Sequence, residues 1–353
     1  MSGIIVTGGA GFIGSNFVKL ITDRGYHAIV LDKMTYAADL SYLSGIDRSK
    51  LLFTEGDIND TELVYNLLAC YDPIGIVHFA AESHVDNSIK DSKPFIETNV
   101  LGTVSMLEAT RRWLANRHHY NIRKQSFRFH HVSTDEVYGS LGPDDAPFTE
   151  TTPYAPRSPY AASKASSDHM VAAYGNTYGI PYVITNCSNN YGKHQHSEKL
   201  IPTVIRKALA NESIPMYGDG SNIRDWIHVE DHCEALLKVF VDGKDKNKYN
   251  IGGKCQISNR VIIGNILAMM GKPADLVKSV GDRPGHDFRY DIDNTKIESE
   301  LGWKPRKDFL IGLNDTIRWY INENTRHNSS GGQIDTTVSG DHGDIETAST
   351  DLR

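Results

Sequence analysis

Cysteine is scarce in this sequence, and long apolar runs are missing. The 353-residue chain has four cysteines, Cys70, Cys187, Cys233 and Cys255, and no two of them form a Cys-x-x-Cys pair. This spacing excludes a disulfide framework and a cysteine zinc site, and it predicts reduced thiols in a cytoplasmic protein. No apolar run approaches the roughly 20 residues of a membrane span. A strand-like pattern already begins at residue 3, so we expect no signal peptide.

Positive charge is also in short supply. The sequence contains 37 Lys and Arg against 44 Asp and Glu, a formal net charge of −7. This balance argues against nucleic acid or an anionic membrane as the main partner. A small anionic ligand is compatible with it, because binding depends on local arginines and lysines. His194 and His196 stand apart from other ligand-type residues, so we predict no metal site.

Apolar runs alternate with segments of helical periodicity along the first half of the chain. The predicted strands are 3–7, 28–32, 51–55, 74–80 and 127–133. Helical spacing is clearest over 12–24 and over 158–178, which follows Ser158-Pro159. Such alternation is typical of βαβ units in an α/β protein. We therefore predict a doubly wound, mostly parallel sheet.

A glycine-rich turn follows the first predicted strand and opens the first predicted helix. In Thr7–Gly14, Gly8 permits a tight turn, Gly11 lets the backbone approach a pyrophosphate, and Gly14 lets helix pack against strand. Asp32 ends the second strand, where an acidic side chain binds a ribose 2′-hydroxyl. A carboxylate there would repel a 2′-phosphate. The pattern predicts a Rossmann-like fold and NAD rather than NADP.

The pattern becomes more irregular after residue 186. We expect an NAD-binding domain over 1–186 and a smaller C-terminal α/β substrate-binding domain over 187–323, with the chain recrossing near 222–250. Shorter helices are predicted at 200–210, 231–242 and 258–271, with loops at 189–197 and 217–224. The segment 324–353 is polar and poor in large apolar groups, which predicts a disordered tail.

Two pairs of reactive side chains follow in the sequence. Tyr160 and Lys164 stand four apart on a predicted helix and share one face. An ammonium there would lower the tyrosine pKa, so that Tyr160 could take a proton from a sugar hydroxyl. Asp135 and Glu136 come just beyond a strand and can act as an acid and a base. Consecutive strand residues point to opposite faces, so both serve one substrate only if the chain leaves strand geometry here.

Further motifs make the chain similar to a known family. They are Thr-Gly-Gly-Ala-Gly-Phe-Ile-Gly (7–14), Ala-Ala-Glu-Ser-His-Val-Asp (80–86), Ser-Thr-Asp-Glu-Val-Tyr-Gly (133–139), Ser-Pro-Tyr-Ala-Ala-Ser-Lys (158–164), Asn-Cys-Ser-Asn-Asn-Tyr-Gly (186–192), Glu-Lys-Leu-Ile-Pro (198–202), Arg-Asp-Trp (224–226) and Asp-Arg-Pro-Gly-His-Asp (282–287). The chain resembles the extended short-chain dehydrogenase/reductase superfamily and, within it, the dTDP-glucose 4,6-dehydratases. The resemblance covers residues 3 to about 322.

This resemblance implies a mechanism. Tyr160 removes the 4-hydroxyl proton as hydride passes from C4 to NAD, and Thr134 steadies the 4-oxygen. Glu136 then abstracts the C5 proton, Asp135 protonates the leaving 6-hydroxyl, and hydride returns to C6. The product is a 4-keto-6-deoxy sugar nucleotide, a precursor of rhamnose and other deoxysugars. A homodimer is also implied.

The resemblance assigns ligand-binding residues as well. Besides Gly8, Gly11, Gly14, Asp32, Tyr160 and Lys164, the residues implied for NAD are Phe12, Ile13, Lys33, Thr35, Asp57, Ile58, Ala80, Ala81, Ser83, Asn99 and Asn190. Those implied for the nucleotide sugar are His84, Thr134, Asn189, Lys199, Leu200, Pro215, Tyr217, Arg224, Asn259, Arg283 and His286.

One segment departs from the family pattern, and alternative functions stay open. Residues 193–197 read Lys-His-Gln-His-Ser, where the family more often has a proline and an aromatic, and we expect a mobile loop near the substrate.

A 4-epimerase would use the same glycine turn and the same Tyr160–Lys164 pair, but it does not need Asp135 and Glu136. A UDP-sugar dehydratase, a decarboxylase of nucleotide-sugar acids and a non-catalytic NAD-binding protein are further alternatives.

Overall fold

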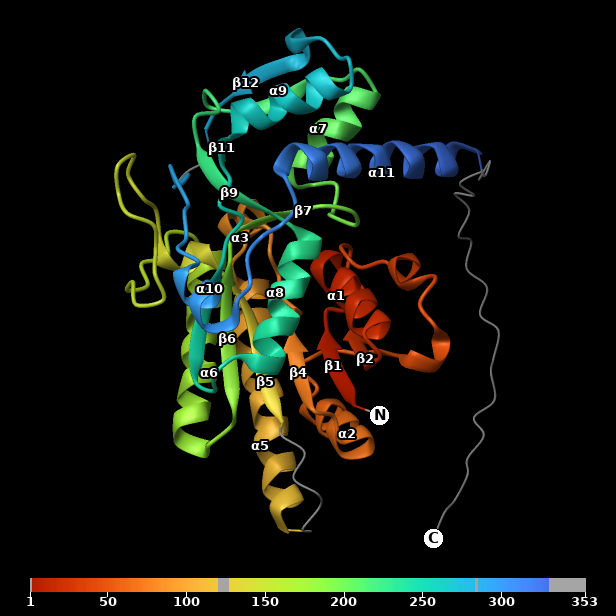
Figure 1. Ribbon diagram of the computed structural model, residues 1–353, viewed down its shortest axis with the longest axis vertical. Helices are drawn as coiled ribbons and strands as arrows, with labels where there is room; N and C mark the ends of the chain where they lie inside the picture. The colour runs from red at the N-terminus through yellow and green to blue at the C-terminus, as the bar shows by residue number, and fades with distance from the viewer. Residues whose placement is uncertain (1, 120–126, 283–284, 330–353) are drawn as a thin grey trace.

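The computed structural model describes residues 2–119, 127–282 and 285–329. A seven-stranded sheet forms the larger part of the molecule, and a smaller part lies above it in Figure 1. The strand order is β10-β6-β5-β4-β1-β2-β3, and every neighbouring pair is parallel. The strands are β1 (Gly3–Thr7), β2 (His27–Asp32), β3 (Leu51–Glu55), β4 (Gly75–His78), β5 (Arg128–Thr134), β6 (Tyr182–Cys187) and β10 (Asn247–Ile251).

Helices cover both faces of this sheet because successive strand side chains point to opposite sides. Ile4 and Val6 pack in one core with α1 (Phe12–Asp23) and α8 (Val229–Asp242). Ile5 packs in the other core, against α2 (Thr61–Tyr71), α5 (Thr103–His119) and α6 (Pro159–Tyr178). The predicted doubly wound parallel sheet is confirmed. Short helices α3 (Val85–Lys90), α4 (Lys93–Phe95) and η3 (Ile96–Gly102, a π-helix) lead into α5.

The smaller part combines short strands with three helices. A three-stranded sheet contains β7 (Asn189–Tyr191), β9 (Ile223–His228) and β11 (Gln256–Ser258), and β8 (Ile214–Tyr217) pairs with β12 (Val277–Val280). Helices α7 (Leu200–Leu209), α9 (Asn259–Met269) and α11 (Phe309–Ser329) share an apolar core there. Between β9 and β11 the chain returns to the large sheet through α8 and β10 (Figure 1). The domain boundaries in the sequence stay predictions.

The remaining short helices are η1 (Leu40–Leu43), η2 (Arg48–Lys50), η4 (Asp135–Tyr138), η5 (Ala274–Leu276) and α10 (Thr295–Leu301). Within the described ranges, no helix has both the length and the apolar character that crossing a bilayer requires.

Two expectations about local structure are wrong. The predicted loop at 189–197 begins with strand β7, which pairs with β9. The predicted disordered tail begins too early, because α11 continues through residues 324–329 to Ser329. Phe309, Leu313 and Ile317, spaced by four, anchor this helix in the core of the smaller part, and no Gly or Pro follows them before residue 331. The rest of the tail, 330–353, lies outside the described residues.

Candidate active site

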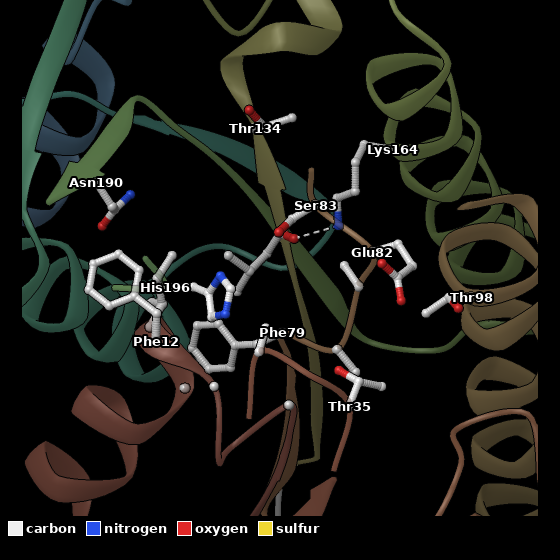
Figure 2. Close-up of a pocket in the computed structure, with 18 of the residues that line it drawn as sticks. Phe12, Thr35, Phe79, Glu82, Ser83, Thr98, Thr134, Lys164, Asn190 and His196 are labelled. Carbon is white, nitrogen blue, oxygen red and sulfur yellow. Dashed lines mark hydrogen bonds between the residues drawn. The ribbon is translucent and has the colours of Figure 1, made fainter. Parts of the chain in front are cut away.

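A cavity of about 350 Å³ opens at the carboxyl ends of the central strands, where ligands bind in open α/β sheets. Figure 2 shows Phe12, Phe79 and His196 on one side of it, and Lys164, Glu82 and Thr98 on the other. It brings together many of the predicted site residues: Gly8, Gly11, Phe12, Ile13, Gly14, Asp32, Lys33, Thr35, Asp57, Ile58, Ala80, Ala81, Ser83, Thr134, Asp135, Glu136, Tyr160, Lys164, Asn189, Asn190 and Lys199.

The glycine turn forms one wall and leaves no space for side chains. Gly8 has a φ of +67°, in the left-handed region that favours glycine. A Cβ atom on Gly8 would lie 2.8 Å from the backbone nitrogen of Ala80. One on Gly14 would lie 2.1 Å from the carbonyl oxygen of Gly8. The turn therefore holds bare backbone beside the first turn of α1, a geometry that suits a pyrophosphate.

Asp32 connects this turn to the end of β2. Its carboxylate is buried, and it accepts hydrogen bonds from the backbone N–H groups of Ala10 (2.9 Å) and Met34 (3.0 Å). Each carboxylate oxygen can accept a second bond, so Asp32 can also hold a ribose hydroxyl at the cavity wall. Nearby, Lys33 forms a 2.7 Å ion pair with Asp57. That pair occupies the ammonium that would otherwise favour a 2′-phosphate. These residues fit NAD.

The chain leaves strand geometry where the two adjacent carboxyls stand. Strand β5 ends at Thr134, whose Oγ1 accepts a hydrogen bond from the backbone N–H of Glu136 (3.3 Å) and caps the 3₁₀ turn η4. Gly139, with a φ of +100°, ends that turn. Because the backbone coils here, Asp135 and Glu136 both line the cavity. The chain therefore leaves strand geometry at this point, which two consecutive residues need if both are to contact one substrate.

The two carboxyls have different surroundings. Asp135 is 2% exposed, and its Oδ1 accepts a hydrogen bond from Thr134 Oγ1 (3.2 Å). Its Oδ2 is buried without a hydrogen-bond partner among the described residues. Burial, and then the charges of Glu136 and Asp225, raise the pKa of Asp135 well above its usual range. Glu136 is less buried. The raised pKa favours the protonated form of Asp135, which has a proton to donate.

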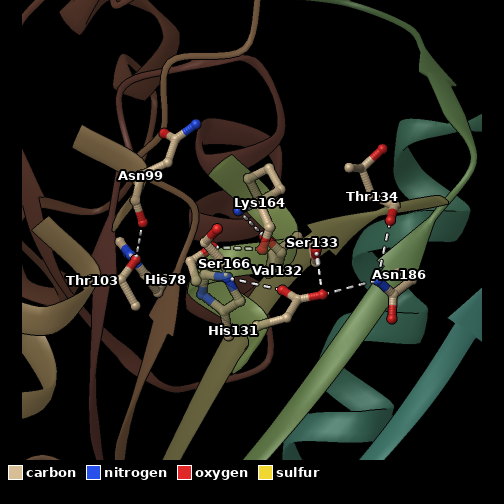
Figure 3. Close-up of polar contacts among 12 residues, drawn as sticks. His78, Asn99, Thr103, His131, Val132, Ser133, Thr134, Lys164, Ser166 and Asn186 are labelled. Atoms are coloured by element: carbon tan, nitrogen blue, oxygen red, sulfur yellow. Dashed lines mark hydrogen bonds and ion pairs between the residues drawn. The ribbon is translucent and has the colours of Figure 1, made fainter. Parts of the chain in front are cut away.

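The Tyr160–Lys164 pair corrects one expectation. Lys164 Nζ donates a hydrogen bond to the backbone oxygen of Val132 (2.8 Å; Figure 3), and burial lowers its pKa to about 8. The pKa of Tyr160 is not lowered by this ammonium. Burial first, and then the charge of Glu136, raise it well above its usual value. The prediction failed because helical spacing reports neither the burial of Tyr160 nor the nearby carboxylate of Glu136.

Comparisons with known proteins agree with this geometry. The family model of GDP-mannose 4,6 dehydratase matches residues 5–316. A dTDP-glucose 4,6-dehydratase of Xanthomonas campestris pv. campestris (strain B100) is 49% identical over 332 residues, covering 91% of this chain and 93% of the relative. This chain belongs to the dTDP-glucose 4,6-dehydratase family.

Solved structures show what the family shares with others of the same fold. DesIV, a dTDP-glucose 4,6-dehydratase from Streptomyces venezuelae crystallised with NAD and TYD, superposes with a TM-score of 0.86 at 44% identity, covering 92% of this chain and 98% of that one. A UDP-glucose 4-epimerase from Thermotoga maritima with UDP-glucose reaches 0.82 at 26% identity, covering 91% and 99%. The fold is common to dehydratases and epimerases, so only the side chains in the cavity can distinguish the two activities.

Several residues assigned by resemblance lie outside the cavity lining. These are Asn99, His84, Leu200, Pro215, Tyr217, Arg224, Asn259 and His286, while Arg283 lies outside the described residues. Asn99 is buried, and its amide bonds to the backbone of Glu82 and to Ser163 Oγ. It therefore holds in place the segment that carries Ser83. Arg224 is buried near Asp135, and its charge opposes the rise in that group's pKa.

Sequence reasoning missed other lining residues: Ala37, Ala38, Gly56, Phe79, Glu82, Thr98, Val132, Ser133, Cys187, Ser188, Gln195, His196 and Glu198. Gln195 and His196 come from the unusual 193–197 loop. This loop packs against the rest of the protein through its neighbouring side chains. His194 stacks on Tyr42 with ring centroids 4.2 Å apart. Gln195 Nε2 donates to the backbone oxygen of Asn190 (2.9 Å). Only the departure from the family pattern hinted that this loop lines the site.

Proposed function

We propose that this protein is an NAD-dependent hydro-lyase that converts dTDP-glucose to dTDP-4-keto-6-deoxyglucose, with NAD regenerated. The observation that carries this proposal is the pair of adjacent carboxyls in one cavity with the glycine turn. Asp135 is buried and its pKa is raised, which favours its protonated form, and Glu136 is more exposed. An epimerase has no use for such a pair, whereas removal of water needs a proton donor and a proton acceptor on neighbouring carbons.

NAD would be held by the Gly8–Gly14 turn, by Asp32 and by the cavity face that carries Ser83 and Lys164. When bound, it takes up a hydride from the sugar and later returns it. A hydroxyl is eliminated easily when it lies β to a carbonyl, because the carbonyl acidifies the hydrogen on the carbon between them, so the sugar must first be oxidised at C4. Tyr160 and Thr134 interact through their side chains, and the ionised form of Tyr160 would accept the proton of the 4-hydroxyl as hydride leaves C4.

The two carboxyls then do separate work. Glu136 removes the hydrogen at C5, which the neighbouring 4-ketone has made acidic. Asp135 gives its proton to the departing 6-hydroxyl, so that water leaves instead of hydroxide. The unpartnered Oδ2 of Asp135 supports this role, because a buried oxygen without a bond is available to a substrate hydroxyl. The environments of the two groups push their protonation states apart, as paired acid–base catalysis requires.

We propose that two basic residues, Lys199 and Arg224, bind the nucleotide diphosphate. Lys199 lines the cavity, and its Nζ donates to the backbone oxygen of Ser83 (3.0 Å). Arg224 is anchored by the backbone oxygens of Ile223 (2.8 Å) and Asp287 (3.0 Å). These bonds hold the guanidinium in a fixed direction, and a planar guanidinium suits a phosphate.

A single incubation tests the activity. We expect dTDP-glucose, mixed with this protein and catalytic NAD, to lose the mass of one water while the NAD remains oxidised at the end. Mass spectrometry of the sugar nucleotide measures this, and UDP-glucose in a parallel tube measures base selection. Unchanged mass with inverted C4 stereochemistry would replace the proposal with a 4-epimerase.

We also propose a homodimer in the cytoplasm. The proposed patch is formed by Ile89, Ile96 and Leu101, which are 41%, 45% and 52% exposed on α3 and η3, both of which contact α6. Such a patch is typical of a protein–protein interface.

Leu101→Glu is expected to convert the dimer to a monomer in analytical ultracentrifugation, because it places a charge within this patch. Ile311→Glu is the matched control, since Ile311 is 62% exposed on α11, outside the patch. A wild-type protein that sediments as a monomer would contradict the dimer.

A further inference from the structure

A buried carboxylate outside the cavity lining lies behind the catalytic residues. Asp168, on α6, is 2% exposed. Its Oδ2 accepts hydrogen bonds from Ser133 Oγ (3.0 Å), Tyr154 Oη (2.7 Å) and Asn186 Nδ2 (3.4 Å), and His131 Nε2 lies 3.3 Å from its Oδ1. Nothing in the family motifs assigns this residue a role. Hydrogen bonds donated to a buried carboxylate favour its charged form.

Lys164 is a buried cation whose charge interacts with that of Asp168. It lies four residues earlier on the same helix, so both side chains point to one side of α6, and it is 4% exposed. Its Nζ bonds to Val132, and Ser133, the next residue along β5, bonds to Asp168 (Figure 3). An ammonium removed from water needs an opposite charge, because a single neutral carbonyl does not replace its hydration.

The other titratable groups around the two residues do not supply that charge at neutral pH. They are His78 on β4, whose pKa burial lowers well below its usual value, and His131 on β5, Cys187 on β6, Tyr154, Tyr138 in η4 and Lys248 on β10. Burial lowers the pKa of His131 to about 4 and raises that of Cys187 to about 12, so both are neutral. The pKa values of both tyrosines are raised, and Lys248 is itself a cation. Asp168, whose pKa is lowered, is the anion.

We propose that Asp168 is the counter-ion and positioning residue of Lys164, keeping its amino group charged and fixed at the base of the cavity. The same carboxylate reaches the acid–base pair, because Asn186 Nδ2 also donates to the backbone oxygen of Thr134 (3.1 Å; Figure 3). One buried charge thus ties the lysine to the strand end that carries Asp135. The inference deepens the proposed function, on which it rests only for the catalytic use of Lys164.

A double-mutant cycle in unfolding free energy tests this without any substrate. The four proteins are wild type, Asp168→Asn, Lys164→Met and the double variant, unfolded in urea at pH 7. Each single change leaves a buried charge without its partner, so we expect the two single losses together to exceed the loss in the double variant. Losses that add within error would overturn the proposal. If Asp168→Asn alone fails to fold, a folded double variant supports it and an unfolded one overturns it.

A second readout separates the charge from the hydrogen bonds. With a folded pKa of about 8, below its unfolded value of about 10.4, Lys164 loses its proton first in the folded state, so unfolding free energy rises with pH across that window. The contribution is isolated by subtracting the Lys164→Met protein. In Asp168→Asn we expect the rise to begin about 1 to 3 pH units lower.

Tyr154→Phe, which removes one hydrogen bond and no charge, is the control, and we expect it to keep the onset near pH 8. An unmoved onset in Asp168→Asn would overturn the proposal. Because neither readout uses a sugar nucleotide, their failure is distinct from failure of the proposed function.

Discussion

Glu136→Gln is expected to stop the loss of water from dTDP-glucose and to leave NAD binding intact. An amide cannot accept the C5 proton, and positioned proton transfer contributes about 10²- to 10⁴-fold to such a step, so turnover should fall by that factor. The substitution is nearly isosteric, and Glu136 comes from the end of β5 and not from the glycine turn that is proposed to bind NAD. The direct measurement is deuterium uptake at C5 from D₂O, followed by mass spectrometry.

Asp135→Asn is the matched control, because it changes the neighbouring carboxyl by the same chemistry. It removes the proton donor for the 6-hydroxyl and leaves the C5 base in place. We expect this variant to retain exchange at C5 while failing to release water. If Glu136→Gln exchanged deuterium at the wild-type rate, Glu136 would have no role as the C5 base.

Gly14→Ala is expected to abolish tight NAD binding. The added Cβ would lie 2.1 Å from the carbonyl oxygen of Gly8 and 2.9 Å from the Cα of Gly9, both of them backbone. Neither atom can rotate away, so α1 must move from the turn that it packs against. Such overpacking costs about 1–3 kcal/mol of stability. A displaced helix N-terminus also misaligns the pyrophosphate site, so we expect a loss of at least about tenfold in affinity, or 1.4 kcal/mol.

Titration calorimetry with NAD and the thermal midpoint of unfolding measure the two effects. Gly264→Ala is the matched control, because no heavy atom lies within 4 Å of a Cβ added at that position in α9. Alanine there is expected to stabilise the helix by about 1 kcal/mol and to leave NAD affinity unchanged. Wild-type affinity in Gly14→Ala would show that Gly14 is not required for close packing of the turn.

Local patterns in the chain predicted much of the large domain. The predicted strands 3–7 and 51–55 match β1 and β3, and the glycine turn lies where its spacing placed it. Such features depend on residues that are neighbours in the chain. The end of α11 was predicted wrongly because a polar composition resembles a tail, whereas a helix anchored by Phe309 and Leu313 extends past its last buried turn.

The adjacent carboxyls show what a pattern leaves undecided. The sequence predicted that Asp135 and Glu136 follow a strand. It did not show that Thr134 caps a turn there, and this turn directs both carboxyls into the cavity. The pKa of Tyr160 was predicted with the wrong sign, because Glu136 lies next to it only in the folded protein.

The sequence by itself determined the fold class, the NAD-type turn and the identity of the reactive groups, because each rests on residues a few positions apart. Tertiary structure alone decided which carboxyl has its pKa raised by burial, which loop residues line the cavity, and that Asp168 on α6 accepts hydrogen bonds from β5 and β6. The physical reason is that protonation depends on burial and on charges brought close by folding, and neither is a property of sequence spacing.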